Sequence, residues 1–94
     1  MFEIQVGEGG RVSMKGRLDA SESDKAQRVL RTLEGPLTVD LSGLDYISSA
    51  GIGVLIETYK RLAAAGHTLR LVNMLPRVRN IFAYAGLDRI LTIE

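Results

Sequence analysis

The feature that most constrains this chain is the stretch of residues 39–56, VDLSGLDYISSAGIGVLI, which is typical of a buried strand, a tight bend and the start of a long amphipathic helix. Two adjacent hydroxyl side chains, Ser48 and Ser49, lie where the bend becomes the helix. Backbone N–H groups at a helix start have no acceptor within the helix, so a hydroxyl there either caps them or points outward. Gly51 and Gly53 leave the first helical turn with little side-chain cover. We therefore predict that a large partner can approach the two serines closely.

Two strands and a helix precede this stretch. Residues 2–6 and 11–15 alternate between apolar and polar side chains, which predicts an antiparallel hairpin that ends at Gly16. Several helix-capping side chains follow in residues 18–24, and Gly35-Pro36 stops the helix that they begin. The apolar residues at helical spacing in this segment are Ala26, Val29, Leu30 and Leu33.

The second half of the chain repeats this alternation of strand and helix. Residues 37–41 predict a strand, residues 49–65 a helix, and residues 69–72 another strand. A third helix begins at Pro76 and ends at Gly86, and residues 90–93 predict a last strand. The expected order is β-β-α-β-α-β-α-β, so residues 1–94 form one α/β domain with amphipathic helices and a mixed, mostly parallel sheet.

The helical periodicity of residues 49–65 assigns a buried and a wet side to this helix. The buried side is expected to carry Ile52, Leu55, Ile56, Tyr59, Leu62 and Ala63. The wet side is expected to carry Ala50, Val54, Glu57, Lys60, Arg61 and Ala64. Val54 would then form a small exposed apolar patch beside the serines, with charges around it. Such a patch is what a transient docking surface needs.

Composition narrows the function classes. Apolar residues make up 46% of the chain, which is enough for an aliphatic core. The net charge of +1 argues against nucleic-acid binding, which usually needs a clustered excess of Lys and Arg. The absence of cysteine excludes disulfides and thiolate metal sites. The first residues contain neither a signal peptide nor an apolar run that could span a membrane, so we expect a cytoplasmic protein.

Catalytic and metal-binding motifs are poorly represented. His67 is the only histidine and follows Gly66, so it is better explained as a solvated turn residue than as a metal ligand. The segment 48–53, SSAGIG, has neither the spacing of a phosphate-binding loop nor that of a nucleophile elbow. A small hydrolase that uses Ser49 is therefore the weakest hypothesis. We expect a protein that is not an enzyme and binds no cofactor or metal.

The run of residues 37–62 resembles the signature of the STAS domain family, and specifically that of bacterial anti-sigma factor antagonists. The similarity is clearest over residues 39–42, VDLS, and 44–55, LDYISSAGIGVL. Residues 16–20, GRLDA, resemble the family's approach to its first helix. Residues 71–73, 76–78, 81–82 and 86–87 resemble its C-terminal half. The resemblance covers nearly the whole chain and implies a single STAS-like domain.

The resemblance implies a partner switch. In such systems the unphosphorylated antagonist binds an anti-sigma factor that is also a serine kinase, and phosphorylation by that kinase releases it. A metal-dependent serine phosphatase then restores the antagonist. The family's acceptor hydroxyl corresponds to Ser49, while Ser48 stands where many relatives have an aspartate and is a less favoured acceptor. Asp19 matches an aspartate that lies near the acceptor in relatives.

These considerations define one expected docking surface and one alternative. The residues expected to contact the partner are Asp19, Ser48, Ser49, Ala50, Gly51, Gly53, Val54, Glu57 and Arg61. The alternative is a constitutive STAS binding or scaffold module whose serines only cap the helix, because serine is among the commonest capping residues. The sequence leaves open the downstream target, the stimulus and the oligomeric state.

Overall fold

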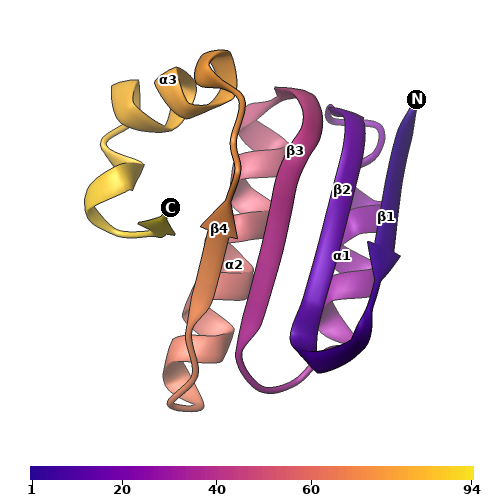
Figure 1. Cartoon of the computed structure of the whole chain (residues 1–94), viewed down its shortest axis with the longest axis vertical. Helices are drawn as coiled ribbons and strands as arrows, with labels where there is room; N and C mark the ends of the chain where they lie inside the picture. The colour runs from indigo at the N-terminus through magenta and orange to yellow at the C-terminus, as the bar shows by residue number, and fades with distance from the viewer.

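A five-stranded mixed sheet is the central element of the molecule (Figure 1). The computed structural model describes all 94 residues. The strands are β1 (Phe2–Val6), β2 (Arg11–Leu18), β3 (Leu37–Ile47), β4 (Leu69–Val72) and β5 (Thr92–Ile93), and they lie in this order across the sheet. β1 is antiparallel to β2, and all other neighbours are parallel. The expected hairpin and mixed sheet are confirmed.

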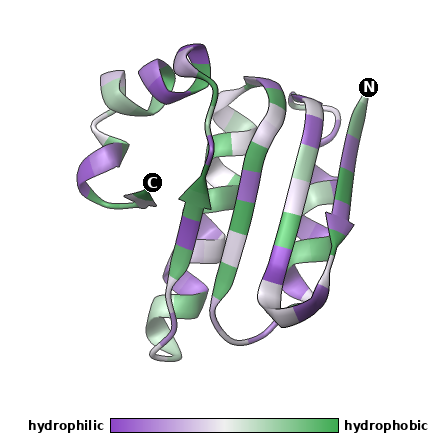
Figure 2. Cartoon of the chain, viewed as in Figure 1, coloured by the Kyte–Doolittle hydropathy of each residue, from purple (hydrophilic) through white to green (hydrophobic).

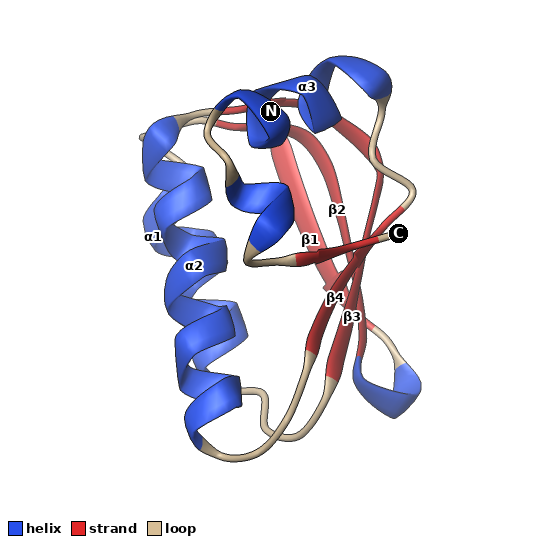
Figure 3. Cartoon of the chain, turned by 90° about the vertical axis from the view of Figure 1, so that its left-hand side faces the viewer, coloured by secondary structure: helices blue, strands red, loops and turns tan.

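Three helices complete the expected order. α1 (Ser23–Arg31) and α2 (Ser49–Ala64) lie side by side on one face of the sheet, and no α-helix covers the opposite face (Figure 3). α3 (Pro76–Tyr84) lies beyond the carboxyl end of β4. Short 3₁₀ turns, η1 (Glu8–Gly10) and η2 (Leu87–Arg89), complete the chain. The last strand is shorter than predicted, because a turn at Ile90 and a bend at Leu91 replace the first half of residues 90–93.

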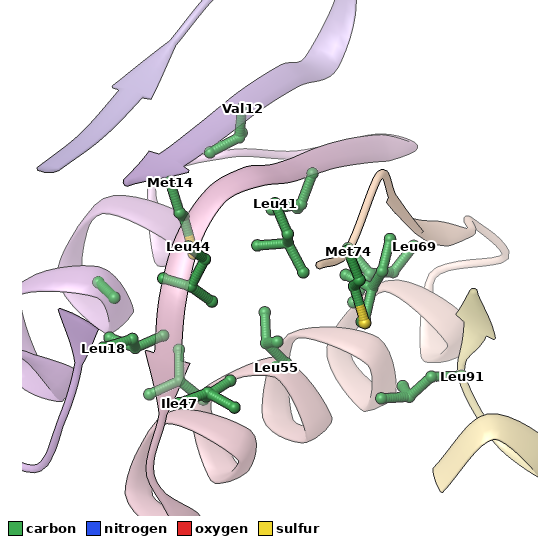
Figure 4. Packing of buried hydrophobic residues seen from close by; sticks show 14 of the residues in the cluster. Val12, Met14, Leu18, Leu41, Leu44, Ile47, Leu55, Leu69, Met74 and Leu91 are labelled. Carbon is green, nitrogen blue, oxygen red and sulfur yellow. The ribbon is translucent and has the colours of Figure 1, made fainter. Parts of the chain in front are cut away.

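A single hydrophobic core lies between the sheet and the side-by-side helices α1 and α2, and it extends to Val78 and Phe82 of α3. Apolar and polar residues alternate along the strands (Figure 2), so the strands direct most of their apolar side chains to the helix-covered face. Leu41 and Leu44 of β3 project toward Leu55 of α2 (Figure 4), and all three are fully buried. Burial of one such side chain contributes about 1.5–3 kcal/mol. The core of 21 residues includes Val54, Leu55 and Leu62 and thus holds α2 against the sheet.

The strand β2 continues past Gly16, where the sequence had predicted its end. Gly16 has a φ of 90°, and a Cβ atom there would lie 2.1 Å from the carbonyl oxygen of Met1. The backbone N–H of Arg17 donates a 2.9 Å hydrogen bond to that carbonyl. Gly16 therefore allows the backbone of β2 to approach the carbonyl of Met1 closely, and it does not terminate the strand.

β3 is longer than the predicted strand of residues 37–41 and contains two irregularities. Its register against β2 shifts between Ser13 and Lys15, and again between Gly16 and Arg17. The second shift pairs Gly16 with Leu44 and Arg17 with Tyr46, which leaves Asp45 as the extra residue of a bulge. Ser42, Gly43 and Asp45 indicated a bend, whereas the strand continues through them with two register shifts.

The rotation of α2 about its axis differs from the prediction. Its buried residues are Gly51, Val54, Leu55, Thr58 and Leu62, whereas the predicted core residues Ile52, Ile56 and Tyr59 are half-buried and Ala63 is exposed. Val54 is only 4% exposed, so the predicted apolar patch is wrong. The physical reason is α1, which packs along the flank of α2 that would be wet on a helix with no lateral neighbour.

Candidate functional site

The carboxyl ends of β2 and β3 bring the candidate residues together. Leu18 pairs with Ile47 at the end of the parallel ladder. One residue further on, the backbone N–H of Ser48 donates a 2.9 Å hydrogen bond to the carbonyl oxygen of Leu18. Asp19 and Ser48 thus leave neighbouring strands at the same edge of the sheet. The Asp19 segment therefore lies beside the segment that carries the serines.

The two serines have different roles at the start of α2. Ser48 is the N-cap residue, with extended backbone angles, and its Oγ accepts a 3.2 Å hydrogen bond from the N–H of Gly51. Ser49 is the first helical residue and is exposed, and its hydroxyl makes no hydrogen bond within the chain. Ser48 therefore stabilises the helix start, while Ser49 presents a free hydroxyl to the solvent.

Asp19 organises the turn that leads into α1. Its carboxylate accepts hydrogen bonds from the Ser21 hydroxyl (2.7 Å) and from the N–H of Glu22 (3.2 Å). The hydrogen bond from Ser21 lowers the pKa of Asp19 most, and the bond from Glu22 and the charge of Arg17 lower it further. The Asp19 carboxylate is thus a fixed negative charge near the serines.

The glycines of the first turn of α2 face opposite directions. A Cβ atom on Gly51 would lie 2.8 Å from Leu18 and 2.9 Å from Ile47, so this glycine lets the helix approach the strand ends. A Cβ atom on Gly53 would meet nothing within 4 Å. The expectation that both glycines open the serines to a partner is therefore wrong for Gly51. Ala50 and Gly53 are exposed as expected.

Glu57 and Arg61 are engaged by α1. The Glu57 carboxylate accepts a hydrogen bond from the Gln27 amide and forms a 2.8 Å ion pair with Arg31. The Arg61 guanidinium donates to the carbonyl oxygens of Leu30 (2.7 Å) and Leu33 (3.0 Å), close to the C-terminal end of α1. These side chains hold the two helices together, which limits their availability for the predicted partner contacts.

The bulge before the serines presents two ordered side chains that the sequence did not single out. Arg77 of α3 donates to the backbone oxygen of Asp45 (3.0 Å) and to its carboxylate (3.1 Å). The guanidinium of Arg17 lies 4.3 Å from the ring centroid of Tyr46. The only sequence signal for these exposed side chains was the interruption of the apolar pattern by Asp45 and Tyr46, between Leu44 and Ile47.

The candidate site is an exposed surface and not a cavity. The largest surface hollow, about 480 Å³, lies by the β1–β2 hairpin and is lined by Val6 and Asp40 among others. Neither Ser48 nor Ser49 lines any hollow. Small ligands usually bind in concave pockets, and the start of α2 does not offer one.

No cluster of three or more His, Cys, Asp or Glu residues has a geometry that could hold a metal ion, and His67 is exposed in its turn. None of the helices is long and apolar enough to cross a bilayer.

The structure is that of a small α/β domain with an exposed helix start, and comparison with known proteins gives its family. The family described as "Mlab, STAS domain" matches residues 2–92, so the chain belongs to the STAS domain family. The anti-sigma F factor antagonist of Lysinibacillus sphaericus is 32% identical over 82 residues, covering 81% of this chain and 69% of that protein. The anti-sigma-B factor antagonist of Bacillus subtilis is 28% identical over 86 residues, covering 88% and 79%.

Other relatives are longer than this chain. The Mycobacterium tuberculosis protein Rv2638 is 39% identical over 62 residues, which cover 66% of this chain and 42% of that protein. The chain thus spans about half the length of some curated relatives. Among solved structures, unphosphorylated SpoIIAA, an anti-sigma factor antagonist, superposes with a TM-score of 0.75 at 17% identity, covering 100% of this chain and 87% of that one. This likeness confirms the fold.

Proposed function

We propose that this protein is an anti-sigma factor antagonist that works by partner switching in the cytoplasm. Its unphosphorylated form binds an anti-sigma factor that is also a serine kinase, phosphorylation of Ser49 releases it, and a serine phosphatase restores the binding form. Family membership and relatives named as anti-sigma factor antagonists support the class. The observation that carries the site is the exposed, unbonded hydroxyl of Ser49 beside the capping Ser48.

The helix start favours Ser49 over Ser48 as the acceptor. Phosphorylation of Ser48 would modify the oxygen that accepts the N–H of Gly51, and the cap would have to rearrange. Ser49 can be modified without loss of an internal hydrogen bond. A phosphate at the first helical position lies near backbone N–H groups and the positive end of the helix dipole, so the domain stays folded.

Phosphorylation changes the surface and leaves the core untouched. It adds about −1.5 to −2 charges beside the exposed residues Ala50 and Gly53. A partner that docks there must remove water from this dianion or pair it with a cation. Asp19 adds a further negative charge at the same edge of the sheet. Release is therefore strongest for a partner whose contact surface is apolar or acidic.

Incubation with the cognate kinase and ATP tests the assignment of the acceptor. We expect one phosphate on Ser49, its loss in Ser49→Ala, and largely preserved incorporation in Ser48→Ala. Mass spectrometry of proteolytic fragments distinguishes the two serines. Phosphate on Ser48, or none on the wild type, would overturn the assignment. The kinase is identified first by its binding to the unphosphorylated domain.

A further inference from the structure

The exposed surface around Ser49 is too small to bind a protein partner alone. Ser49, Ala50 and Gly53 are exposed, but Gly51 and Val54 are buried against the strands and α1. A specific protein–protein interface takes about 800 Å² from each partner. Three small residues cannot supply this area, so the docking surface must extend beyond the first turn of α2.

The bulge that precedes the serines presents a side chain suited to this extension. The ring of Tyr46 is exposed, and the guanidinium of Arg17 lies 4.3 Å from its centroid. Tyr and Arg are the residue types that most often dominate binding energy at interfaces. Because Arg17 holds the ring in place, binding costs Tyr46 little conformational freedom.

The Tyr46–Arg17 pair adjoins the serines on the same edge of the sheet. Tyr46 precedes Ser49 by three residues, so their Cα atoms lie within about 11 Å of each other. Arg17 is next to Leu18, whose carbonyl oxygen accepts the N–H of Ser48. A partner of ordinary size that covers Ser49 can therefore cover Tyr46 as well.

Charged side chains lie in the segments next to the ring. Asp45 precedes Tyr46 in the chain, and its carboxylate is paired with Arg77 at 3.1 Å. Arg17, which contacts the ring, also lies close enough to Asp19 for its charge to stabilise that carboxylate. The exposed aromatic ring thus has both acidic and basic groups in its neighbourhood. This arrangement selects a partner surface with an apolar recess for the ring and an acidic side chain opposite Arg17.

We propose that Tyr46 and Arg17 form a second docking element for the same anti-sigma partner that reads the phosphorylation state of Ser49. This inference rests on the proposed function. Neither residue lines a surface hollow, which argues against a small-molecule ligand. In this arrangement Ser49 switches binding on and off, and the Tyr46–Arg17 pair determines which partner is bound.

Calorimetric titration of the anti-sigma partner tests this inference. We expect at least about tenfold weaker binding for Tyr46→Ala and near-normal binding for Tyr46→Phe, because the ring and not its hydroxyl makes the contact. Arg17→Glu should also weaken binding at least about tenfold by placing like charges opposite each other. The matched control is Arg70→Ala, an exposed arginine paired with Glu94 on another part of the sheet, which should bind within about twofold of the wild type.

Ser49→Asp in the same titration separates this inference from the proposed function. Weaker binding of Ser49→Asp together with unchanged binding of Tyr46→Ala and Arg17→Glu overturns the inference and leaves the switch intact. Wild-type protein that binds no anti-sigma partner overturns both. Should Tyr46→Ala lower the melting temperature markedly, Arg17→Glu carries the test, and its unchanged affinity contradicts the inference.

Discussion

At the scale of single residues, we propose that the two adjacent serines divide stability and regulation between them. Ser48 accepts the N–H of Gly51, whereas Ser49 makes no internal hydrogen bond. We predict that Ser48→Ala lowers the free energy of unfolding by about 1 kcal/mol and that Ser49→Ala changes it by less than about 0.5 kcal/mol. Urea unfolding of both variants measures the difference. A larger loss for Ser49→Ala would show that the cap is assigned to the wrong serine.

The two glycines of the same helical turn provide a second matched pair. Gly51→Ala places a methyl group within 3 Å of Leu18 and Ile47, so we expect a loss of about 1–3 kcal/mol in the free energy of unfolding. Gly53→Ala meets open space and should gain about 0.5–1 kcal/mol, because alanine is the better helix former. Thermal unfolding measures the change in stability of both variants. Changes of the same sign would contradict the close packing of Gly51 against the strand ends.

Asp19 makes stability depend on pH in the acid range. Its pKa in the folded protein lies below the ordinary value of 3.8, so its carboxylate contributes stability above that value and loses the contribution as the pH falls through the lowered pKa. Asp19→Asn should therefore be less stable than the wild type at pH 6, with a smaller difference near pH 3. Urea unfolding at both pH values measures this. A difference that does not shrink in acid would exclude the ionised carboxylate as its cause.

At the scale of elements, α2 shows what a helical pattern can and cannot predict. Its bounds followed from the capping serine and from Gly66, because these signals are local. Its rotation did not, because α1 covers one flank and an isolated pattern contains no information about a lateral neighbour. Glu57 and Arg61 appeared to mark a wet face, yet they bond to α1.

The burial of Val54 gives a direct test of this corrected rotation. We predict that Val54→Asp loses about 3 kcal/mol or more in the free energy of unfolding, because an unpaired charge enters the core. Ala50→Asp places the same charge at the exposed start of the helix and should be at least as stable as the wild type. Circular dichroism during thermal unfolding compares them. A fully stable Val54→Asp would restore the exposed position predicted from the sequence.

The strands were predictable where their pattern was regular. The alternation of residues 2–6 and 11–15 gave the hairpin, but the end of β2 and most of β3 were missed. Gly16, Ser42, Gly43 and Asp45 are of residue types typical of turns in an isolated sequence. In the folded chain they lie within strands, because β2 continues to pair with β3 on both sides of each register shift.

At the scale of the whole molecule, the site is assembled from segments distant in sequence. Asp19 follows β2, the serines follow β3, and Arg77 reaches Asp45 from α3. Sequence reasoning located the serines and Asp19, because a helix start and a family signature are contiguous. It missed the Tyr46–Arg17 pair, because that contact depends on the register between two strands.

The central claim, that Ser49 controls partner binding, is tested most directly by calorimetric titration of the anti-sigma partner with Ser49→Asp and Ser49→Ala. Aspartate supplies only part of the charge of a phosphate, yet we predict at least about tenfold weaker binding, or about 1.4 kcal/mol. Ser49→Ala should bind like the unphosphorylated wild type and no longer respond to ATP. Both variants should remain as stable as the wild type within about 0.5 kcal/mol. Unchanged affinity of Ser49→Asp would contradict the switch and favour a constitutive scaffold.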